Sequence, residues 1–180
     1  MADALRVTGL REIFTPRQIS LRIQELAKDI DALYGEEPLV AICVLKGAFV
    51  FCSDLVRCLR NKNIEVDFVR LFSYGNSSAS SEQVVINKDV DIPLNGKHVL
   101  IVEDIVDSGR SMHFLLERLA ARNVRSLRLA AFIDKHERRE VAVHVDFAAF
   151  RVDRGFMVGY GLDYAERWRA LPAVCEIIAG

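Results

Sequence analysis

The chain has 180 residues, of which 51% are hydrophobic and 27% charged, with a formal net charge of −1. This composition suits one globular domain with a full core, so we expect a single domain over residues 1–180. The balanced charge leaves no basic excess of the kind that nucleic-acid binding requires. The longest apolar runs are too short to span a bilayer, and the N-terminus lacks the apolar core of a signal peptide. We therefore expect a cytoplasmic protein without nucleic-acid or membrane partners.

The four cysteines of the chain form no Cys-x-x-Cys pair. Three of them lie in apolar surroundings, and we expect these three to be core thiols in a reducing compartment. A redox role is not expected.

The first half of the chain predicts helices and strands in alternation. Thr15 and Pro16 are typical of a helix start, and apolar residues at helical spacing follow at positions 19, 23, 26, 30 and 33. Leu39–Leu45 is a continuous apolar run, as expected for a strand buried on both faces. A second helix is predicted at residues 48–59 and a second strand at residues 66–72.

The second half opens with a low-complexity stretch, residues 73–81, whose small polar side chains bury too little surface to offset their ordering entropy. The elements expected after it are strands at 84–86 and 99–102, a helix at 111–122, and strands at 127–132, 147–150 and 156–158. Strands that alternate with helices predict an α/β fold, an open and mainly parallel sheet flanked by helices.

Three carboxylates follow the apolar strand at residues 99–102, namely Glu103, Asp104 and Asp107. The small, hydroxyl-rich turn at residues 108–111 comes next and opens a helix. A helix N-terminus presents unpaired N–H groups that suit a phosphate, and ligands of open α/β sheets bind at the carboxyl ends of the strands. Adjacent carboxylates there can bind vicinal sugar hydroxyls or hold Mg²⁺.

The alternative for this stretch is an aspartate that caps a helix, followed by a solvated turn. Three acids within five residues make that alternative the weaker one. The chain contains neither Gly-x-x-x-x-Gly-Lys-Ser/Thr nor Gly-x-Gly-x-x-Gly, which argues against an NTPase P-loop and a dinucleotide-binding fold.

Five blocks in matching order resemble the hypoxanthine-guanine phosphoribosyltransferases, a group of type I phosphoribosyltransferases. They cover roughly residues 39 to 177, and ordered blocks are more specific than any single motif. The blocks are Val44-Leu45-Lys46-Gly47, Leu71-Phe72-Ser73-Tyr74-Gly75, residues 99–112, Asp134-Lys135 with residues 137–141, and residues 156–164 with Arg169 beyond. The resemblance implies the type I fold, with a core at about residues 36–145 and a small hood from about 1–20 and 150–180.

The implied reaction transfers 5-phosphoribosyl from phosphoribosyl pyrophosphate to N9 of a 6-oxopurine. Asp107 is implied to be the general acid/base near purine N7, a role typically worth ~10²–10⁴-fold. Glu103 and Asp104 are implied to bind the ribose hydroxyls, directly or through Mg²⁺. The remaining substrate contacts of this signature are assigned to Ile105, Val106, Ser108, Gly109, Arg110 and Ser111, with only a backbone role for Arg110.

The pyrophosphate side of the site is implied by two further blocks. The resemblance places the backbone of Lys46, in a cis peptide, and of Gly47 against pyrophosphate. Ser73 and Tyr74 stand at the stem of the low-complexity loop, which is implied to be a catalytic lid that excludes water. A plain surface loop is the alternative for this stretch.

The purine side is implied by the last two blocks. The ammonium of Lys135 would donate to the 6-oxo group, which favours hypoxanthine and guanine over adenine. Phe156 would stack on the base and the Met157 backbone would read its edge. Asp163 would hold a second Mg²⁺ and Arg169 would grip pyrophosphate, although Asp163 could equally cap a helix over residues 164–169.

The chain departs from the family pattern beside the base. Residues 152–156 read Val-Asp-Arg-Gly-Phe where family members commonly have Ile-Pro-Asp-Lys-Phe, so the choice among hypoxanthine, guanine and xanthine stays open. Met157 replaces a common valine, and Ala48 replaces a frequent second glycine.

The sequence therefore predicts an Mg²⁺-dependent purine salvage enzyme that makes IMP and GMP. One rival is a xanthine- or guanine-selective relative. The other is a non-catalytic regulator of the same fold that senses nucleotides. The family resemblance implies a homodimer or homotetramer.

Overall fold

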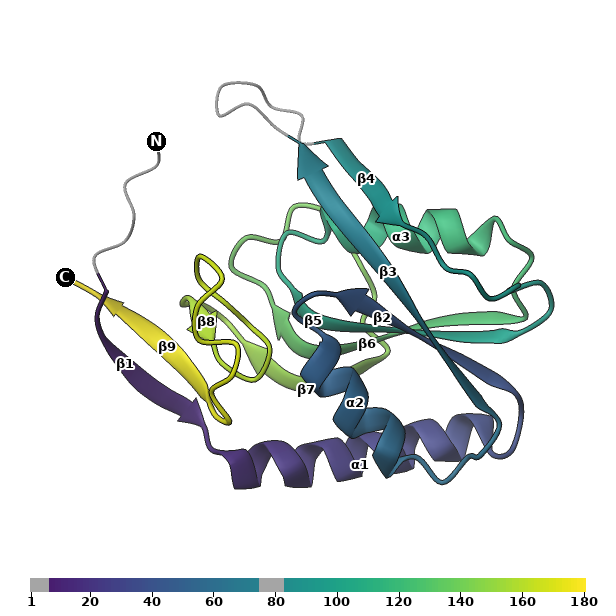
Figure 1. The fold of residues 1–180 in the computed structure, drawn as a ribbon, viewed down its shortest axis with the longest axis horizontal. Coiled ribbons are helices and arrows are strands. Elements are labelled where there is room, and N and C mark those ends of the chain that lie inside the picture. The colour runs from purple at the N-terminus through teal and green to yellow at the C-terminus, as the bar shows by residue number, and fades with distance from the viewer. Residues whose placement is uncertain (1–6, 75–82) are drawn as a thin grey trace.

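The computed structural model describes residues 7–74 and 83–180, in which two sheets carry the architecture (Figure 1). The six-stranded central sheet has the order β4 (Gln83–Lys88), β3 (Ile64–Tyr74), β2 (Leu39–Leu45), β5 (His98–Val106), β6 (Ser126–Lys135), β7 (Phe147–Val152). The smaller sheet has the order β1 (Val7–Phe14), β9 (Val174–Ala179), β8 (Met157–Val158). The helices are α1 (Pro16–Tyr34), α2 (Phe49–Cys58) and α3 (Arg110–Ala120).

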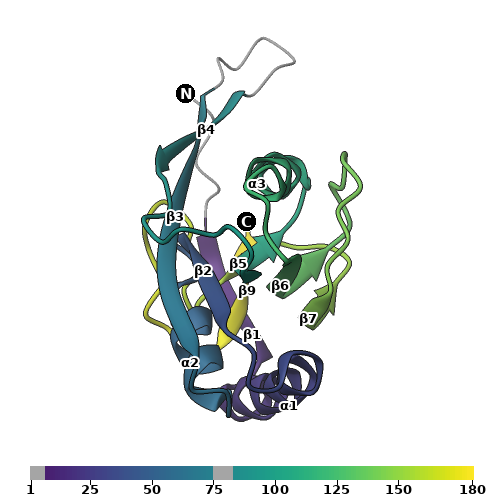
Figure 2. The same cartoon turned by 90° about the vertical axis from the view of Figure 1, so that its right-hand side faces the viewer.

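The central sheet is parallel from β3 to β7, and only the edge strand β4 runs antiparallel, paired with β3. Figure 2 shows α1 and α2 on one face of this sheet and α3 on the other. The α/β fold expected from the alternation of strands and helices is therefore confirmed. The smaller sheet joins the two ends of the described chain, since β1 pairs antiparallel with β9, and it forms the expected hood.

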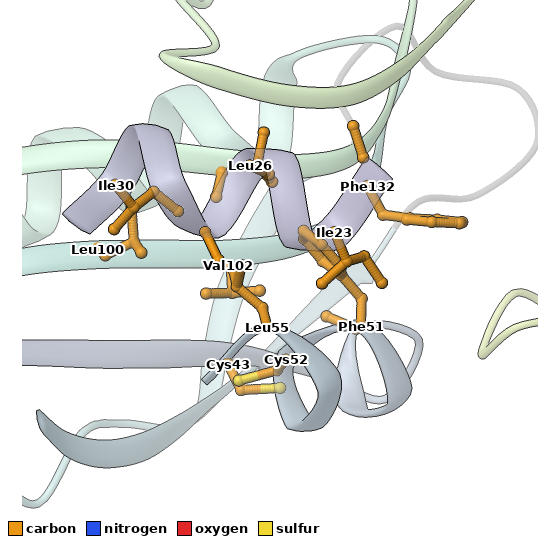
Figure 3. Close-up of a cluster of buried hydrophobic side chains, with 14 of the residues drawn as sticks. Ile23, Leu26, Ile30, Cys43, Phe51, Cys52, Leu55, Leu100, Val102 and Phe132 are labelled. Atoms are coloured by element: carbon orange, nitrogen blue, oxygen red, sulfur yellow. The ribbon is translucent and has the colours of Figure 1, made fainter. Parts of the chain in front are cut away.

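The inner strands β2, β5 and β6 of the central sheet are mostly buried on both faces because helices pack against both faces of the sheet. In β5, Leu100 and Val102 join the core under α1 and α2, whereas Val99 and Ile101 join the core under α3. Figure 3 shows the first of these cores, where side chains of α1 and α2 meet those of the sheet. Burial on both faces explains the continuous apolar run of β2, whose predicted bounds match the observed strand.

Helix α1 begins where the sequence predicts. The Thr15 side chain accepts a hydrogen bond from the Gln18 backbone N–H, and the Gln18 side chain accepts one from the Thr15 N–H, so the two residues form a capping box. The predicted apolar stripe is buried except for Leu33, which is 53% exposed, and Tyr34 is buried in its place. Gly35, with φ of 54°, ends the helix.

Three predictions about local structure were wrong in detail. The strand expected at residues 156–158 is only the two-residue β8, which belongs to the hood sheet. Residues 164–169 form turns instead of a helix, with positive φ at Ala165, Glu166 and Trp168. Three core thiols were expected, but only Cys43 and Cys52 are buried, whereas Cys175 is partly buried and Cys58 is exposed. In the ranges that the structure describes, no helix is both long and apolar enough to cross a membrane.

Candidate active site

The predicted site residues lie at the carboxyl ends of neighbouring parallel strands. Lys46 and Gly47 follow β2, Asp107 follows β5, and Lys135 is the last residue of β6. Parallel strands end at the same edge of a sheet, so residues distant in sequence meet there. The hood segment with Phe156, Met157 and Asp163 lies at the same edge, since it shares a cavity with Asp107 and Lys135.

The first two carboxylates of the acidic stretch differ in exposure. Glu103 is buried, and burial together with the neighbouring carboxylate of Asp104 raises the pKa of Glu103 well above its ordinary value. The Asp104 side chain accepts a hydrogen bond from the Ile105 N–H at 2.8 Å and lines the cavity. Asp104 therefore lines the cavity, whereas Glu103 is buried and does not.

The loop after β2 is packed too closely for side chains. A Cβ added to Gly47 would lie 1.5 Å from Asp104 Oδ2, and one added to Gly161 would lie 2.1 Å from the Gly47 carbonyl oxygen. The Leu45–Lys46 peptide is cis, as the family resemblance implied. The backbone of this loop is therefore held between the acidic stretch and the hood.

Two residues predicted to bind pyrophosphate, Lys46 through its backbone and Arg169 through its side chain, have side chains that share one partner, Glu166. Lys46 Nζ lies 2.8 Å from Glu166 Oε1, and Arg169 Nη2 lies 3.2 Å from Glu166 Oε2. The pKa of Glu166 is lowered below its ordinary value, mainly by the hydrogen bond from Lys46 and next by the one from Arg169. Arg169 also lies 2.8 Å from Asp163 Oδ1. The structure thus gathers Lys46, Asp163 and Arg169 around one anionic group.

The turn that opens α3, which the sequence predicts to bind a phosphate, is tightly packed. Gly109 has φ of 84°, and an added Cβ would lie 2.3 Å from the Val141 carbonyl oxygen, so only glycine fits. The Arg110 guanidinium pairs with Glu140, away from the turn, in agreement with a purely backbone role. The structure therefore leaves the backbone N–H groups at the start of α3, rather than the Arg110 side chain, to face an anion.

Arg139, which the sequence analysis missed, fastens this turn to the segment after β6. It donates to the backbone carbonyls of Val106, Asp107 and Lys135 at 2.8–2.9 Å and to Asp134 Oδ1 at 2.6 Å. No local pattern marks it, because its partners come from two strands. The only sequence signal for Arg139 was that it belongs to residues 137–141, one of the blocks that resemble the family.

The purine-binding residues expected from the sequence line one small cavity of about 150 Å³. Lys135 Nζ lies 3.6 Å from Asp107 Oδ2 and 3.3 Å from Glu137 Oε2, and the Lys135 side chain is buried. The walls also include Arg138, which the sequence analysis did not single out, at 2.5 and 3.0 Å from Asp107 Oδ2. The full set of lining residues is Asp104, Ile105, Asp107, Lys135, Arg138, Gly155, Phe156, Met157, Leu162 and Asp163.

Larger hollows exist but gather few of the predicted residues. A hollow of about 760 Å³ between β4 and α3 includes only Arg110 among them, and one of about 540 Å³ beside α1 and α2 includes only Arg169. We regard the small cavity as the base site because its chemistry, rather than its size, matches a purine.

Other predicted residues stand apart from that cavity. Val106 is buried at the end of β5, and Ser111 lies in the first turn of α3. Ser73 and Tyr74 end β3, while their side chains and the expected lid at residues 75–81 lie outside the described residues.

The described residues form no preformed site for a divalent cation. Within residues 7–74 and 83–180, no three His, Cys, Asp or Glu side chains converge as ligands. Mg²⁺ is usually held by one or two carboxylates together with substrate phosphates and water, so the pair Glu103–Asp104 and the single Asp163 fit such binding.

A mainly parallel sheet, with carboxylates at a strand end and a glycine turn at a helix start on the same edge, is typical of α/β enzymes that bind nucleotides or sugar phosphates. Residues 10–165 match the phosphoribosyl transferase domain family. The chain belongs to this family, among the hypoxanthine and hypoxanthine-guanine phosphoribosyltransferases.

The relatives are similar over nearly their full lengths. The hypoxanthine-guanine phosphoribosyltransferase of Aquifex aeolicus is 41% identical over 171 residues, covering 94% of this chain and 96% of the relative. The hypoxanthine phosphoribosyltransferase of Escherichia coli is 41% identical over 170 residues, covering 93% and 95%. The crystal structure of a hypoxanthine-guanine phosphoribosyltransferase from Bacillus anthracis is 35% identical, with a TM-score of 0.89 over 96% of this chain and 100% of that one.

Proposed function

We propose that this enzyme transfers the 5-phosphoribosyl group of phosphoribosyl pyrophosphate to N9 of hypoxanthine and guanine, releasing pyrophosphate and forming IMP and GMP. The observation that carries the proposal is the approach of Asp107 to Lys135 over a cavity lined by Phe156 and Met157. N7 and O6 lie side by side on one edge of a 6-oxopurine. A carboxylate and an ammonium 3.6 Å apart can address both atoms at once.

The proposed chemistry assigns the proton to Asp107. As the bond from C1 to the pyrophosphate oxygen breaks, N9 bonds to C1 and the N7 proton passes to the Asp107 carboxylate. Lys135 donates a hydrogen bond to O6, where negative charge would otherwise gather. In adenine the same position carries an amino group, a donor that faces a donor, which disfavours that base.

We assign the other substrate contacts to residues at the carboxyl edge of the central sheet. We assign the sugar hydroxyls to Asp104 with Glu103 behind it, and the neighbouring stretch of substrate to Ile105 and Val106. The 5-phosphate is assigned to the turn from Ser108 to Ser111. Phe156 stacks on the base and the Met157 backbone reads its edge.

Pyrophosphate is assigned to the Lys46–Gly47 backbone and Arg169. The Glu166 carboxylate lies between the side chains of Lys46 and Arg169, so this part of the site already holds an anionic group. Ser73 and Tyr74 belong to the lid in this proposal.

The donor set also fits Mg²⁺. Glu103 with Asp104 would hold one ion and Asp163 another, and bound Mg²⁺ would neutralise charge on the leaving pyrophosphate. EDTA should then abolish turnover, and calorimetry should show weaker binding of phosphoribosyl pyrophosphate without Mg²⁺. Turnover in excess EDTA would contradict the metal assignment.

The decisive experiment is a turnover assay with phosphoribosyl pyrophosphate, Mg²⁺ and each of hypoxanthine, guanine, xanthine and adenine. Product from the first two supports the proposal, and product from xanthine or guanine alone supports a selective relative. No product from any base would favour the nucleotide-sensing regulator. Asp107→Asn should lower kcat by ~10²–10⁴-fold with binding of phosphoribosyl pyrophosphate nearly intact.

We further propose one domain, with its core at residues 36–145 and its hood at residues 1–20 and 150–180, in a cytoplasmic homodimer or homotetramer. Exposed apolar side chains, among them Phe49, Val66 and Phe68, support self-association. Light scattering coupled to size-exclusion chromatography measures the assembly directly, and a monomer would contradict it.

A further inference from the structure

The Asp107 side chain is held asymmetrically. Both hydrogen bonds from the Arg138 guanidinium end on the same oxygen, since Nε and Nη2 lie 3.0 and 2.5 Å from Oδ2. Lys135 Nζ, at 3.6 Å, also approaches Oδ2. The other oxygen, Oδ1, is buried and has no hydrogen-bond partner among the residues described. One oxygen of this carboxylate therefore accepts two hydrogen bonds, and the other accepts none among the described residues.

A buried oxygen without a partner is costly unless a ligand completes it. Asp107, Lys135 and Arg138 line the same cavity, which is the proposed base site. Because Oδ2 already accepts two hydrogen bonds from Arg138, Oδ1 is the oxygen of this carboxylate with the capacity left to accept one from a purine N7–H.

We propose that Arg138 is a positioning residue for phosphoribosyl transfer, which holds Asp107 by Oδ2 so that Oδ1 receives the proton from purine N7. The inference rests on the acid/base role of Asp107 proposed above. In the step, N9 bonds to C1, the bond from C1 to the pyrophosphate oxygen breaks, and the N7 proton passes to Oδ1. Arg138 itself transfers no proton.

Neighbouring cations do not duplicate this role. Arg139 contacts Asp107 only at its backbone carbonyl, and its guanidinium otherwise donates to Asp134 and to three further carbonyls. Lys135 lies beyond hydrogen-bond distance of Oδ2 and is shared with Glu137. Arg138 alone among the three makes close hydrogen bonds to the carboxylate itself.

The exposure of Arg138 makes the inference testable. Its side chain is 68% exposed, so its removal leaves no cavity in the core. The hydrogen bond to Asp107, followed by the charge of that carboxylate, raises the pKa of Arg138, so the guanidinium stays charged. Loss of Arg138 should therefore affect the chemistry more than the fold.

The experiment is a double-mutant cycle on kcat, with R138A, R138K, D107N and D107N/R138A compared with wild type at saturating phosphoribosyl pyrophosphate and hypoxanthine. R138A should lower kcat roughly 10- to 100-fold, as expected for a misplaced catalytic group. The KM for phosphoribosyl pyrophosphate should stay within about twofold, and R138K should recover part of kcat. In the D107N background, removal of Arg138 should change kcat by no more than about twofold, because its partner is gone.

A matched control is R125A, since Arg125 pairs with exposed Glu37 and lies just before β6, at the end of that strand opposite Lys135. It should leave kcat unchanged. Thermal unfolding of every variant checks that each one folds.

Other kinetic results would overturn the inference, and each of them points to a different error. An unchanged kcat in R138A, or the same loss in both backgrounds, would show that Arg138 does not act through Asp107. A raised purine KM with normal kcat would make it a binding residue. If wild type turns over but D107N keeps full kcat, the role of Asp107 fails as well, and if wild type forms no product the proposed function itself fails.

Discussion

Gly47 and Asp104 touch so closely that no side chain fits between them, since a Cβ on Gly47 would lie 1.5 Å from Asp104 Oδ2. The two residues belong to different strand ends, those of β2 and β5. Their contact joins the proposed pyrophosphate loop to the proposed sugar-binding carboxylate, so the position of one determines that of the other.

Gly47→Ala should therefore reduce kcat/KM for phosphoribosyl pyrophosphate by roughly 100-fold, because it displaces Asp104 and the loop together. Gly96→Ala is the control, since nothing lies within 4 Å of its added Cβ, although φ is 71°. That control should cost about 1 kcal/mol of stability and leave the kinetics unchanged. Normal kinetics in Gly47→Ala would contradict the role given to this contact.

Asp67 should make stability depend on pH. Burial alone would raise the pKa of this carboxyl, but the N–H groups of Ile92, Phe68 and Asp91, with Lys88, lower it below its ordinary value. A lowered folded-state pKa contributes stability above the unfolded value near 3.8, which is lost as pH falls towards the folded value. Asp67→Asn should thus lose about 1–3 kcal/mol at pH 7.

The measurement is urea unfolding of both proteins from pH 7 to pH 3. The difference in unfolding free energy should shrink once pH falls below the ordinary pKa of aspartate. A constant difference across this range would mean that the ionised carboxylate is not the stabilising form.

Arg139→Met should be among the most destabilising single substitutions. Arg139 and Asp134 are both largely buried, and removal of one partner leaves the other as an uncompensated charge. We expect a loss of about 3–5 kcal/mol in urea unfolding, together with reduced kcat/KM for both substrates. Arg125→Met, which breaks an exposed pair, should change stability by less than about 1 kcal/mol. Equal losses of unfolding free energy in the two variants would refute the proposal that Arg139 holds the turn after β5 to the segment after β6.

The thiols should react in two groups. Cys58 is exposed, whereas Cys43 and Cys52 are buried. The hydrogen bond to Cys52 and burial raise the pKa of Cys43, so its thiolate is scarce. Ellman's reagent should modify Cys58 first in the native protein and the buried pair only after denaturation. Cys58→Ser should abolish the fast phase, and its persistence would place another thiol at the surface.

Much of the fold was predictable from local pattern. The bounds of β2 follow from a continuous apolar run, and the start of α1 from a threonine, a proline and the spacing of apolar residues. Such patterns report burial on one or two faces, which periodicity encodes directly. Prediction failed for residues 156–169, where single glycines and positive φ angles form turns that periodicity does not describe.

The acidic strand end, the glycine of the proposed phosphate-binding turn and the ordered blocks could be recognised in the sequence, because each is contiguous and its chemistry is local. The pairing of Asp107 with Arg138, 31 residues apart, was not. It exists because β5 and β6 are parallel and end at one edge, and because the segment after β6 folds back over the turn after β5. The tertiary contact between these two segments decides that Arg138 binds Oδ2 of Asp107 and that Oδ1 has no partner among the described residues. No local sequence pattern encodes this difference.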